Sequence, residues 1–367
     1  MKIASVVGAR PNFVKLAPIH KAIKSFSDHT IIHTGQHYDY TLSKIFFKEF
    51  NLPPPDVELE VGSGDPGCQT GEMIKRLERF FLKSNFEIVL VYGDTNSTFA
   101  GAFAASKSGF KVGHIEAGLR SFDRSMPEEL NRILTDHVSD HLFAPTKTAV
   151  QNLQKENVYG EVLYTGDLSV EIIKSASSLA SKSSVLDDLG LESKSYMLFT
   201  MHRAENTNHK KNMSSVIQAF EVLSQKQTEI KIIFPMHPRT MSKLKMMGLY
   251  KRLKDCVKVI IIEPQGYIDF IKLMSNAQKV ITDSGGIQKE SYLLKVPCVT
   301  IRNNTEWVET LNDGWNILTG TDTNRIVEAI VDRTFEQNYR LTIKPIFGSG
   351  KTSKIIKDAI LSIVQNQ

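Results

Sequence analysis

Strand-length apolar runs alternate with amphipathic stretches along most of the chain. In the first half these runs cover residues 3–7, 30–34, 86–92, 111–115, 141–144 and 162–165. Residues 69–84 are amphipathic, because Met73, Leu77 and Phe80 or Phe81 recur at helical spacing. Strands that alternate with helices at this distance predict a parallel, doubly wound α/β sheet.

The second half repeats this pattern after a Ser- and Lys-rich stretch, residues 172–195. Its apolar runs cover residues 196–200, 230–235, 257–262, 279–282 and 297–301. A chain of 367 residues is long enough for about two domains. We therefore expect an N-terminal domain over residues 1–168, a C-terminal domain over residues 169–347, and a last helix within residues 348–367 that packs back on the first domain.

Composition and charge narrow the class of protein. The hydrophobic content of 41% and charged content of 23% are ordinary for a globular protein. The net charge of +5 comes from scattered Lys and Arg, which argues against a nucleic-acid partner and is compatible with a small anionic substrate. The three cysteines have no CxxC spacing, so they predict a reducing compartment and no metal site. No apolar run approaches the roughly 18 residues that cross a bilayer, and the start is too short for a signal peptide, so we expect a cytoplasmic protein without a membrane partner.

Three carboxylates lie at chain positions where ligands bind in such sheets, namely after a strand or at the start of a helix. Asp94 follows the run that ends at Tyr92, Glu116 follows the run that ends at Ile115, and Glu128 lies behind Pro127 in a helical first turn. Paired carboxylates in a closed site can divide acid and base work between them. Each also has a structural interpretation, because Glu128 and Glu129 favour a helix N-terminus and Asp94 can cap a helix.

Two turns have the character of anion sites. The strand over residues 3–7 leads to Gly8-Ala9-Arg10-Pro11, and the following helix carries Lys15, so helix N–H groups and two cations predict phosphate binding. Ser284-Gly285-Gly286 before a helix is a second phosphate cradle, with Glu290 one turn further on as a candidate ribose ligand. A G-x-G-x-x-G motif is absent, so a nicotinamide cofactor is not expected.

Other polar clusters also follow strands. His202 with Arg203 can bind phosphate or shuttle a proton, and His237 lies in a weaker cluster of the same kind. Phe270 can stack on a base or lie in the core. Gly348-Ser349-Gly350-Lys351-Thr352 looks like the end of a P-loop, but Pro345 occupies the position where that motif requires Gly, so we reject it.

Together these stretches resemble the non-hydrolysing UDP-N-acetylglucosamine 2-epimerase family over nearly the whole chain. The most specific segments are Gly93-Asp94-Thr95, residues 114–120, residues 127–132, His202-Arg203 and residues 283–288. The resemblance implies a GT-B fold, with two Rossmann-like domains facing a central cleft. By that resemblance Asp94, Glu116, Glu128 and His202 match catalytic positions. Positions that hold UDP and the sugar are matched by Arg10, Lys15, Gln265, Phe270, Ser284, Gly285, Gly286, Glu290 and Arg302, and Gln69 and Arg203 are further candidates for substrate binding.

The implied reaction is reversible C2 epimerisation of UDP-N-acetylglucosamine (UDP-GlcNAc) to UDP-N-acetylmannosamine (UDP-ManNAc), for polysaccharide or glycan precursors. The family expels UDP and passes through a 2-acetamidoglucal intermediate, without a cofactor or metal, and it implies a homodimer. Gln36 and His237 match the family's second, activating site, where Cys68 and Asp39 depart from its pattern.

Residues 305–309 read Thr-Glu-Trp-Val-Glu in place of Thr-Glu-Arg-Pro-Glu, and the chain looks like a branch that includes epimerases of UDP-2,3-diacetamido-2,3-dideoxyglucuronic acid. The alternative functions are a 2-epimerase of that substrate, a UDP-GlcNAc-hydrolysing enzyme, a GT-B glycosyltransferase and a non-catalytic sugar-nucleotide sensor.

Overall fold

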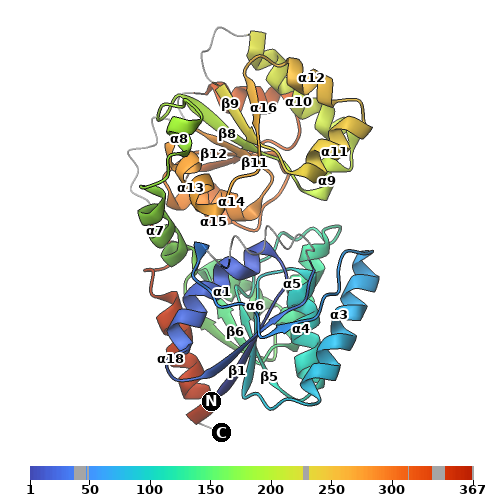
Figure 1. The fold of residues 1–367 in the computed structure, drawn as a ribbon, viewed down its shortest axis with the longest axis vertical. Helices are drawn as coiled ribbons and strands as arrows, with labels where there is room; N and C mark the ends of the chain where they lie inside the picture. Colours follow the sequence, from blue (N-terminus) through green and yellow to red (C-terminus); the bar gives the residue numbers. More distant parts are fainter. Residues whose placement is uncertain (37–46, 48, 226–230, 313, 333–343, 366–367) are drawn as a thin grey trace. The chain divides into compact units, whose positions relative to one another are not determined.

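The computed structural model describes residues 1–36, 47, 49–225, 231–312, 314–332 and 344–365 of the chain. The chain divides into two compact units, Met1–Ile172 with Pro345–Gln367, and Ile173–Lys344. The sequence placed the corresponding boundaries at 168/169 and 347/348. Each unit is an α/β domain around a parallel sheet (Figure 1), which confirms the predicted fold class of two Rossmann-like domains.

In the part of the first unit that is described, the sheet has the strand order β3-β2-β1-β4-β5-β6-β7, and every pair is parallel. The strands are β1 (Lys2–Val7), β2 (Asp28–His33), β3 (Val57–Glu58), β4 (Ile88–Tyr92), β5 (Lys111–Ile115), β6 (His141–Ala144) and β7 (Glu161–Tyr164). The order reverses direction beside β1, where the chain moves first to β2 and later to β4. The carboxyl ends of β1, β4 and β5 are therefore neighbours, and ligands bind at such a place in open α/β sheets.

Helices cover both faces of this sheet (Figure 1). They are α1 (Arg10–Ile23), α3 (Pro66–Phe81), α4 (Asn96–Lys107), α5 (Pro127–Val138), α6 (Lys147–Lys155) and α18 (Thr352–Gln365), whereas α7 (Ser169–Ala180) contains the boundary between the two units. Helix α3 packs on α4, α4 packs on α5, and α1 packs on α18. A core cluster joins apolar residues of β1, β2, β4 and β5 to the inner faces of α3 and α4. Burial of that apolar surface fixes the strands, and with them the turns that follow the strands.

The chain returns to the first unit through the segment that resembled a P-loop. Gly166 and Gly348 both have positive φ, +77° and +88°, and a side chain on Gly348 would meet Gly166 Cα at 2.9 Å. Asp167 N donates to Phe347 O at 2.9 Å, and Thr352 Oγ1 donates to Thr165 O at 3.1 Å. These glycines therefore allow two backbone segments to cross closely, and α18 then packs beside α1.

The second unit repeats the architecture with a sheet of order β10-β9-β8-β11-β12-β13 among the described residues, again parallel throughout. Its strands are β8 (Tyr196–Thr200), β9 (Lys231–Pro235), β10 (Val259–Ile262), β11 (Val280–Thr282), β12 (Cys298–Thr300) and β13 (Asn316–Leu318). Its helices are α8 (Val185–Asp188), α9 (Ala204–Thr207), α10 (Lys210–Gln225), α11 (Pro238–Met246), α12 (Tyr250–Asp255), α13 (Tyr267–Asn276), α14 (Gly285–Leu293), α15 (Val308–Asn312) and α16 (Thr323–Val331). One core cluster of this unit places the inner faces of α10 and α16 against β8, β9, β11 and β12.

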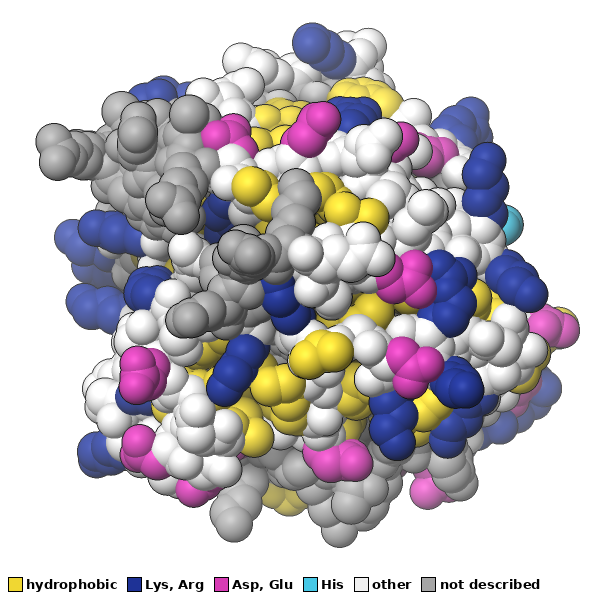
Figure 2. Space-filling model, turned by 90° about the horizontal axis from the view of Figure 1, so that it is seen from above, with side chains coloured by type: hydrophobic (Ala, Val, Ile, Leu, Met, Phe, Trp, Pro, Cys, Tyr) yellow, Lys and Arg dark blue, Asp and Glu magenta, His cyan; other side chains and the backbone are white. Residues whose placement is uncertain are grey.

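The surface agrees with the charge pattern of the sequence. Figure 2 shows Lys and Arg side chains spread around the visible face, with Asp and Glu side chains between them. Within the described ranges, none of the helices is both long enough and apolar enough to cross a membrane.

Candidate functional site

The turn after β4 presents Asp94 at the end of the sheet. Gly93 has φ +69°, and Thr95 caps α4, with its Oγ1 accepting from Thr98 N at 3.3 Å. The alternative in which Asp94 caps this helix is therefore wrong, because Thr95 occupies that position. The Asp94 side chain is instead 29% exposed and faces Arg132 of α5.

Glu116 and Lys15 form an ion pair in which both side chains are largely buried. Glu116 has φ +76°, which is uncommon for a residue with a side chain. The N–H groups of Glu116 and Ala117 both donate to Phe143 O at 3.1 Å, and these bonds hold the turn in that conformation. A Cβ atom on Gly93 would lie 2.8 Å from Lys15 Nζ and 3.4 Å from Glu116 Oε2, so the Asp94 turn packs directly against this pair.

A small pocket of the first unit adjoins this cluster. Lys15 and Glu116 line it, and Thr165, Asp167 and Thr352 contribute other parts of its wall. Carboxylate and ammonium groups thus meet at a pocket beyond the carboxyl ends of parallel strands, where open α/β sheets bind their ligands.

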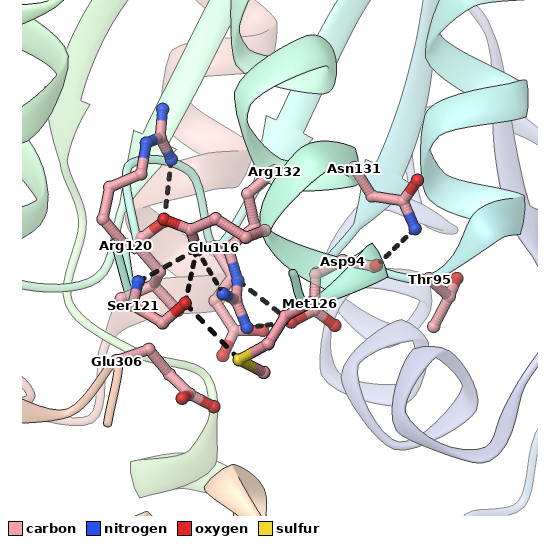
Figure 3. Close-up of polar contacts among 12 residues, drawn as sticks. Asp94, Thr95, Glu116, Arg120, Ser121, Met126, Asn131, Arg132 and Glu306 are labelled. Atoms are coloured by element: carbon pink, nitrogen blue, oxygen red, sulfur yellow. Dashed lines mark hydrogen bonds and ion pairs between the residues drawn. The ribbon is translucent and has the colours of Figure 1, made fainter. Parts of the chain in front are cut away.

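Helix α5 supplies the groups that hold Asp94 (Figure 3). Arg132 is buried and donates to Asp94 Oδ2 from Nε at 3.1 Å and from Nη2 at 2.6 Å. Asn131 Nδ2 donates to Asp94 O at 3.0 Å, so the backbone and the carboxylate of Asp94 are both fixed. Glu128 is half-buried one turn before Arg132, on the same side of α5, as i and i+4 positions are.

Glu129 is the buried member of the Glu128-Glu129 pair. Its carboxylate accepts from Arg132 Nη1 at 2.7 Å, from Ser121 N and Oγ at 2.9 and 3.0 Å, and from Phe122 N at 2.8 Å. The interpretation of Glu129 as merely favouring the helix N-terminus is therefore wrong. Neither Glu129 nor Arg132 was among the candidate site residues predicted from the sequence. Their i, i+3 spacing and their place in the 127–132 motif were the available signals.

The first predicted anion site is partly occupied by the protein itself. Gly8 N and Ala9 N donate to Asn12 Oδ1 at 3.2 and 3.1 Å, so these two N–H groups are used internally. Arg10 begins α1 and is exposed, whereas Lys15 contacts Glu116. What this turn offers a ligand is therefore mainly the charge of Arg10 and Lys15.

Two candidate residues, Gln36 and Gln69, are linked at the amino end of α4. Gln69 Nε2 donates to Gln36 O at 3.2 Å, and Gln36 Oε1 accepts from Ser97 Oγ at 2.6 Å. Cys68, the neighbour of Gln69, is exposed. Asp39, the other position noted in this region, lies outside the described residues.

In the second unit a buried carboxylate organises the turn after β8. Asp283 is fully buried and accepts from His202 N at 3.1 Å and from Arg203 N at 3.0 Å. His202 Nδ1 lies 3.7 Å from Asp283 Oδ1, and the His202 side chain is 49% exposed. The strand order places β8 next to β11, so the turn with His202 after β8 lies beside the turn with Ser284 after β11.

Arg302 lies in a cluster of opposite charges beside the glycines of α14. Its Nη1 donates to Glu306 Oε2 at 2.9 Å, and its Nε lies 3.2 Å from Glu205 Oε1. Arg203 Nη2 lies 3.7 Å from Glu306 Oε1. A Cβ atom on Gly285 would overlap the Glu306 carboxylate, so glycine is required there for close approach.

The remaining candidates of this unit occupy varied environments. Phe270 is buried in α13, and Glu290 accepts from Tyr267 OH at 2.9 Å. Ser284 precedes α14 and its N donates to Thr282 Oγ1 at 3.0 Å, and Gly286 is the second residue of that helix. Gln265 Nε2 donates to Glu263 O at 2.8 Å. The exposed His237 caps α11 by accepting from Arg239 N at 3.1 Å.

Among the residues that the structure describes, no group of His, Cys, Asp and Glu has the arrangement of a metal site. The two units thus offer carboxylates with cations in the first, and helix N-termini, His202 and Arg302 in the second. Such groups suit acid–base chemistry and the binding of an anionic ligand.

Comparisons with known proteins identify the family. The sequence model of the family described as UDP-N-acetylglucosamine 2-epimerase matches residues 21–361. A UDP-N-acetylglucosamine 2-epimerase homolog of Methanococcus maripaludis is 49% identical over 99% of this chain and 100% of its own length. The UDP-2,3-diacetamido-2,3-dideoxy-D-glucuronate 2-epimerase of Pseudomonas aeruginosa is 40% identical over 99% and 100% of the two chains.

A solved structure agrees with these matches. The crystal structure of UDP-GlcNAc 2-epimerase from Methanocaldococcus jannaschii, in complex with UDP-GlcNAc and UDP, superposes with a TM-score of 0.91 at 41% identity. The match covers 99% of this chain and 100% of that chain. The resemblance read from the sequence motifs is thereby confirmed, and the chain belongs to the UDP-N-acetylglucosamine 2-epimerase family.

Proposed function

We propose that this protein reversibly epimerises UDP-GlcNAc at C2 to UDP-ManNAc, as a non-hydrolysing enzyme. The observation that supports this most directly is the cluster at the ends of β4 and β5. There the Lys15–Glu116 pair packs against the turn of Asp94, and Arg132 binds the Asp94 carboxylate. Family membership and the relative that was solved with UDP-GlcNAc and UDP support the same substrate class.

The chemistry of the substrate explains why carboxylates and cations occur together. No carbonyl lies beside C2, so its hydrogen is not acidic. Proton removal from C2 accompanied by cleavage of the C1–O bond gives a C1=C2 double bond and UDP, which leaves with the bonding electron pair. Return of a proton to the opposite face of C2, with addition of UDP to C1, completes the epimerisation through 2-acetamidoglucal.

The residues divide into two sets for these steps. Asp94, Glu116 and Glu128 are the proposed proton-transfer groups, and each step needs one of them near C2. Lys15, Arg10 and His202 are proposed to stabilise charge on the departing diphosphate. Nucleotide and sugar contacts are assigned to the remaining candidates, Gln69, Arg203, Gln265, Phe270, Ser284, Gly285, Gly286, Glu290 and Arg302.

Proton NMR of the protein with UDP-GlcNAc in deuterated water tests this function in one experiment. We expect UDP-ManNAc to appear, deuterium to replace hydrogen at C2 of both sugars, and free sugar to remain absent. Accumulation of UDP with free N-acetylmannosamine would identify a hydrolysing enzyme instead. Binding of UDP-GlcNAc without any turnover would favour a sugar-nucleotide sensor, and transfer of the sugar to an acceptor without C2 exchange would favour a glycosyltransferase.

UDP-2,3-diacetamido-2,3-dideoxy-D-glucuronate is the second candidate substrate. The P. aeruginosa relative named for it is 40% identical over nearly the full chain. Trp307 also stands where the common bacterial pattern has Arg, and it is buried with Lys289 Nζ 4.1 Å from the centre of its ring. Measurement of kcat/KM for both sugars under the same conditions decides between them, because the physiological substrate class should have the higher value.

The same proposal includes a homodimer and a regulatory role for Gln36 and His237. Sedimentation of the purified protein measures the oligomeric state. Initial rates at rising UDP-GlcNAc concentration test the regulatory role, because an activating site gives a sigmoidal dependence of rate on concentration. Gln36→Ala and His237→Ala would remove that sigmoidal dependence.

A further inference from the structure

A buried histidine lies directly beneath the two turns that carry Asp94 and Glu116. His114 belongs to β5, is fully buried, and precedes Glu116 by two positions. Its Nε2 lies 2.8 Å from Gly93 O, and Gly93 is the residue before Asp94. Its Nδ1 lies 2.6 Å from Asp136 Oδ1 on α5. One imidazole ring therefore joins the β4 turn, β5 and α5.

Asp136 ties the same ring to the far side of the Glu116 turn. Its second oxygen accepts from Gly118 N at 3.1 Å and lies 2.8 Å from Arg120 Nη1. Arg120 in turn donates from Nε and Nη2 to Glu156 at 2.7 Å each. A continuous series of polar contacts thus runs from His114 through Asp136 and Arg120 to Glu156. Its members are buried except Glu156, whose carboxylate lies 3.6 Å from His137 Nε2.

The partners of the ring fix its orientation. Gly93 O is a carbonyl oxygen and can only accept, so Nε2 must donate a hydrogen. Nδ1 shares a hydrogen with Asp136 Oδ1, which fixes the other side of the ring. Burial acts to raise the pKa of Asp136, but His114 and Arg120 outweigh it and hold that pKa below its usual value. Both ring nitrogens are therefore hydrogen-bonded, and the ring cannot turn without losing its bond to one of the two segments.

We propose that His114, held in place by Asp136, is a positioning residue that fixes the spacing of the Asp94 and Glu116 turns. It contacts neither carboxylate through its ring. It acts through Gly93 O on one turn and, by way of Asp136, through Gly118 N on the other. This inference rests on the proposed function, since it assumes that Asp94 and Glu116 transfer protons at one sugar carbon.

Backbone geometry explains why such a device is needed. Glu116 at φ +76° and Gly118 at φ +81° make the turn a conformation that an isolated chain would rarely keep. Gly93 is held on both sides by β5, because its N donates to Ile115 O at 2.9 Å and its O accepts from His114.

The first test needs no substrate. In protein labelled with ¹⁵N on histidine, we expect Nε2 of His114 to resonate as an N–H group and to show its bonded proton. A Nε2 without a proton would overturn the proposal. In His114→Gln the backbone amide resonances of Asp94 and Glu116 should both shift, because both turns lose an anchor. Unchanged resonances at either residue would also overturn it.

The second test measures catalysis. His114→Gln and Asp136→Asn should each lower kcat by about 10- to 100-fold, with KM within about twofold of the wild-type value, because misplaced catalytic groups still bind substrate. His29→Gln is the matched control. His29 is another histidine of the first unit with both nitrogens in hydrogen bonds, and it lies in β2 away from the candidate site. It should lose thermal stability and keep kcat.

The outcomes separate this inference from the proposed function. Wild-type kcat in His114→Gln, or a loss confined to melting temperature as in His29→Gln, would overturn the positioning role. If His114→Gln fails to fold, Asp136→Asn and the ring resonances of the wild type still decide. A wild-type protein that turns over neither candidate sugar would remove the proposed function, whereas the ring and amide resonances would still accept or reject the link between the two turns.

Discussion

Arg132 Nη2 lies 2.6 Å from Asp94 Oδ2, and Nη1 of the same guanidinium lies 2.7 Å from Glu129 Oε2. One buried cation therefore joins a partly exposed carboxylate at the candidate site to a buried carboxylate that holds residues 121 and 122. The fork of the guanidinium fits this task, because it presents donors in two directions at fixed angles.

Replacing Arg132 should damage both catalysis and stability. Arg132→Met leaves Glu129 buried without its cation, which costs about 3–5 kcal/mol of unfolding free energy for a broken buried pair. The same change frees Asp94 to move, and we expect kcat to fall by about 100-fold or more. Urea unfolding and steady-state kinetics measure the two effects.

Arg132→Lys is the control for charge without the fork. It should recover part of the stability and little of kcat, because one ammonium cannot hold both carboxylates at the observed angles. A lysine variant with wild-type kcat would show that charge alone, and not the position of Asp94, matters here.

The exchange reaction isolates the role of Glu116. Glu116→Gln keeps the size of the side chain and removes the charge that Lys15 contacts, so we expect deuterium incorporation at C2 to fall by about 10²- to 10⁴-fold. The readout is the C2 proton signal of UDP-GlcNAc in deuterated water. Glu72 forms a half-exposed ion pair with Arg76 on α3, so Glu72→Gln is the control and should exchange at the wild-type rate. Exchange at that rate in Glu116→Gln would remove Glu116 from the mechanism.

The sequence predicted the strands and the polar residues that follow them, because buried parallel strands are nearly continuous apolar runs. Asp94 and Glu116 lie at the ends of such runs, so their neighbourhood followed from the strand order of a doubly wound sheet. The strands β3 and β13 were missed because neither lies in a longer apolar run. The equally short β11 and β12 were predicted, because they lie within the apolar runs 279–282 and 297–301. Helix α3 begins at Pro66, earlier than the predicted residue 69, since proline suits a first helical position.

The direction in which each polar side chain points could not be predicted from the sequence. Glu128 and Glu129 are adjacent and chemically alike, and only the packing of α5 on the sheet decides that Glu129 is buried against Arg132. The turn at Gly8 has the pattern of an anion site, but Asn12 takes two of its N–H groups through a contact that no spacing rule predicts. Hydrogen bonds between side chains of distant segments depend on tertiary structure, and apolar periodicity does not report them.

Gly285 should tolerate no side chain. A Cβ atom there overlaps the Glu306 carboxylate, so Gly285→Ala must move Glu306 away from Arg302. We expect a loss of about 1–3 kcal/mol in unfolding free energy, measured in urea, and a higher KM for the UDP-sugar.

The adjacent glycine is the matched control. A Cβ atom on Gly286 meets only Ser284 Oγ at 3.9 Å, so Gly286→Ala should leave the unfolding free energy unchanged or raise it by up to about 1 kcal/mol. Equal unfolding free energies for the two alanine variants would contradict the close approach of Gly285 to Glu306.

A histidine pair on the first unit predicts acid sensitivity of the fold. His29 Nε2 lies 2.7 Å from Ser5 Oγ, and its Nδ1 lies 2.9 Å from His20 Nδ1. Burial, with a smaller contribution from His20, lowers the pKa of His29 to about 3 from 6.5. The pKa of His20 is lowered as well, by burial and Lys24. The folded protein therefore binds the His29 proton more weakly than the unfolded chain does.

The sign of the pH dependence follows from this difference. Stability is lost as pH falls below 6.5, because the unfolded chain takes up the proton first, and the loss levels off below about pH 3, where both states are protonated. Between pH 7 and pH 5 the contribution of His29 is about 2 kcal/mol. His29→Gln should flatten the dependence of unfolding free energy on pH by that amount, measured in urea at several pH values, whereas His209→Gln, at an exposed position, should leave it as in the wild type. A wild-type slope in His29→Gln would mean that His29 already carries its proton in the folded state.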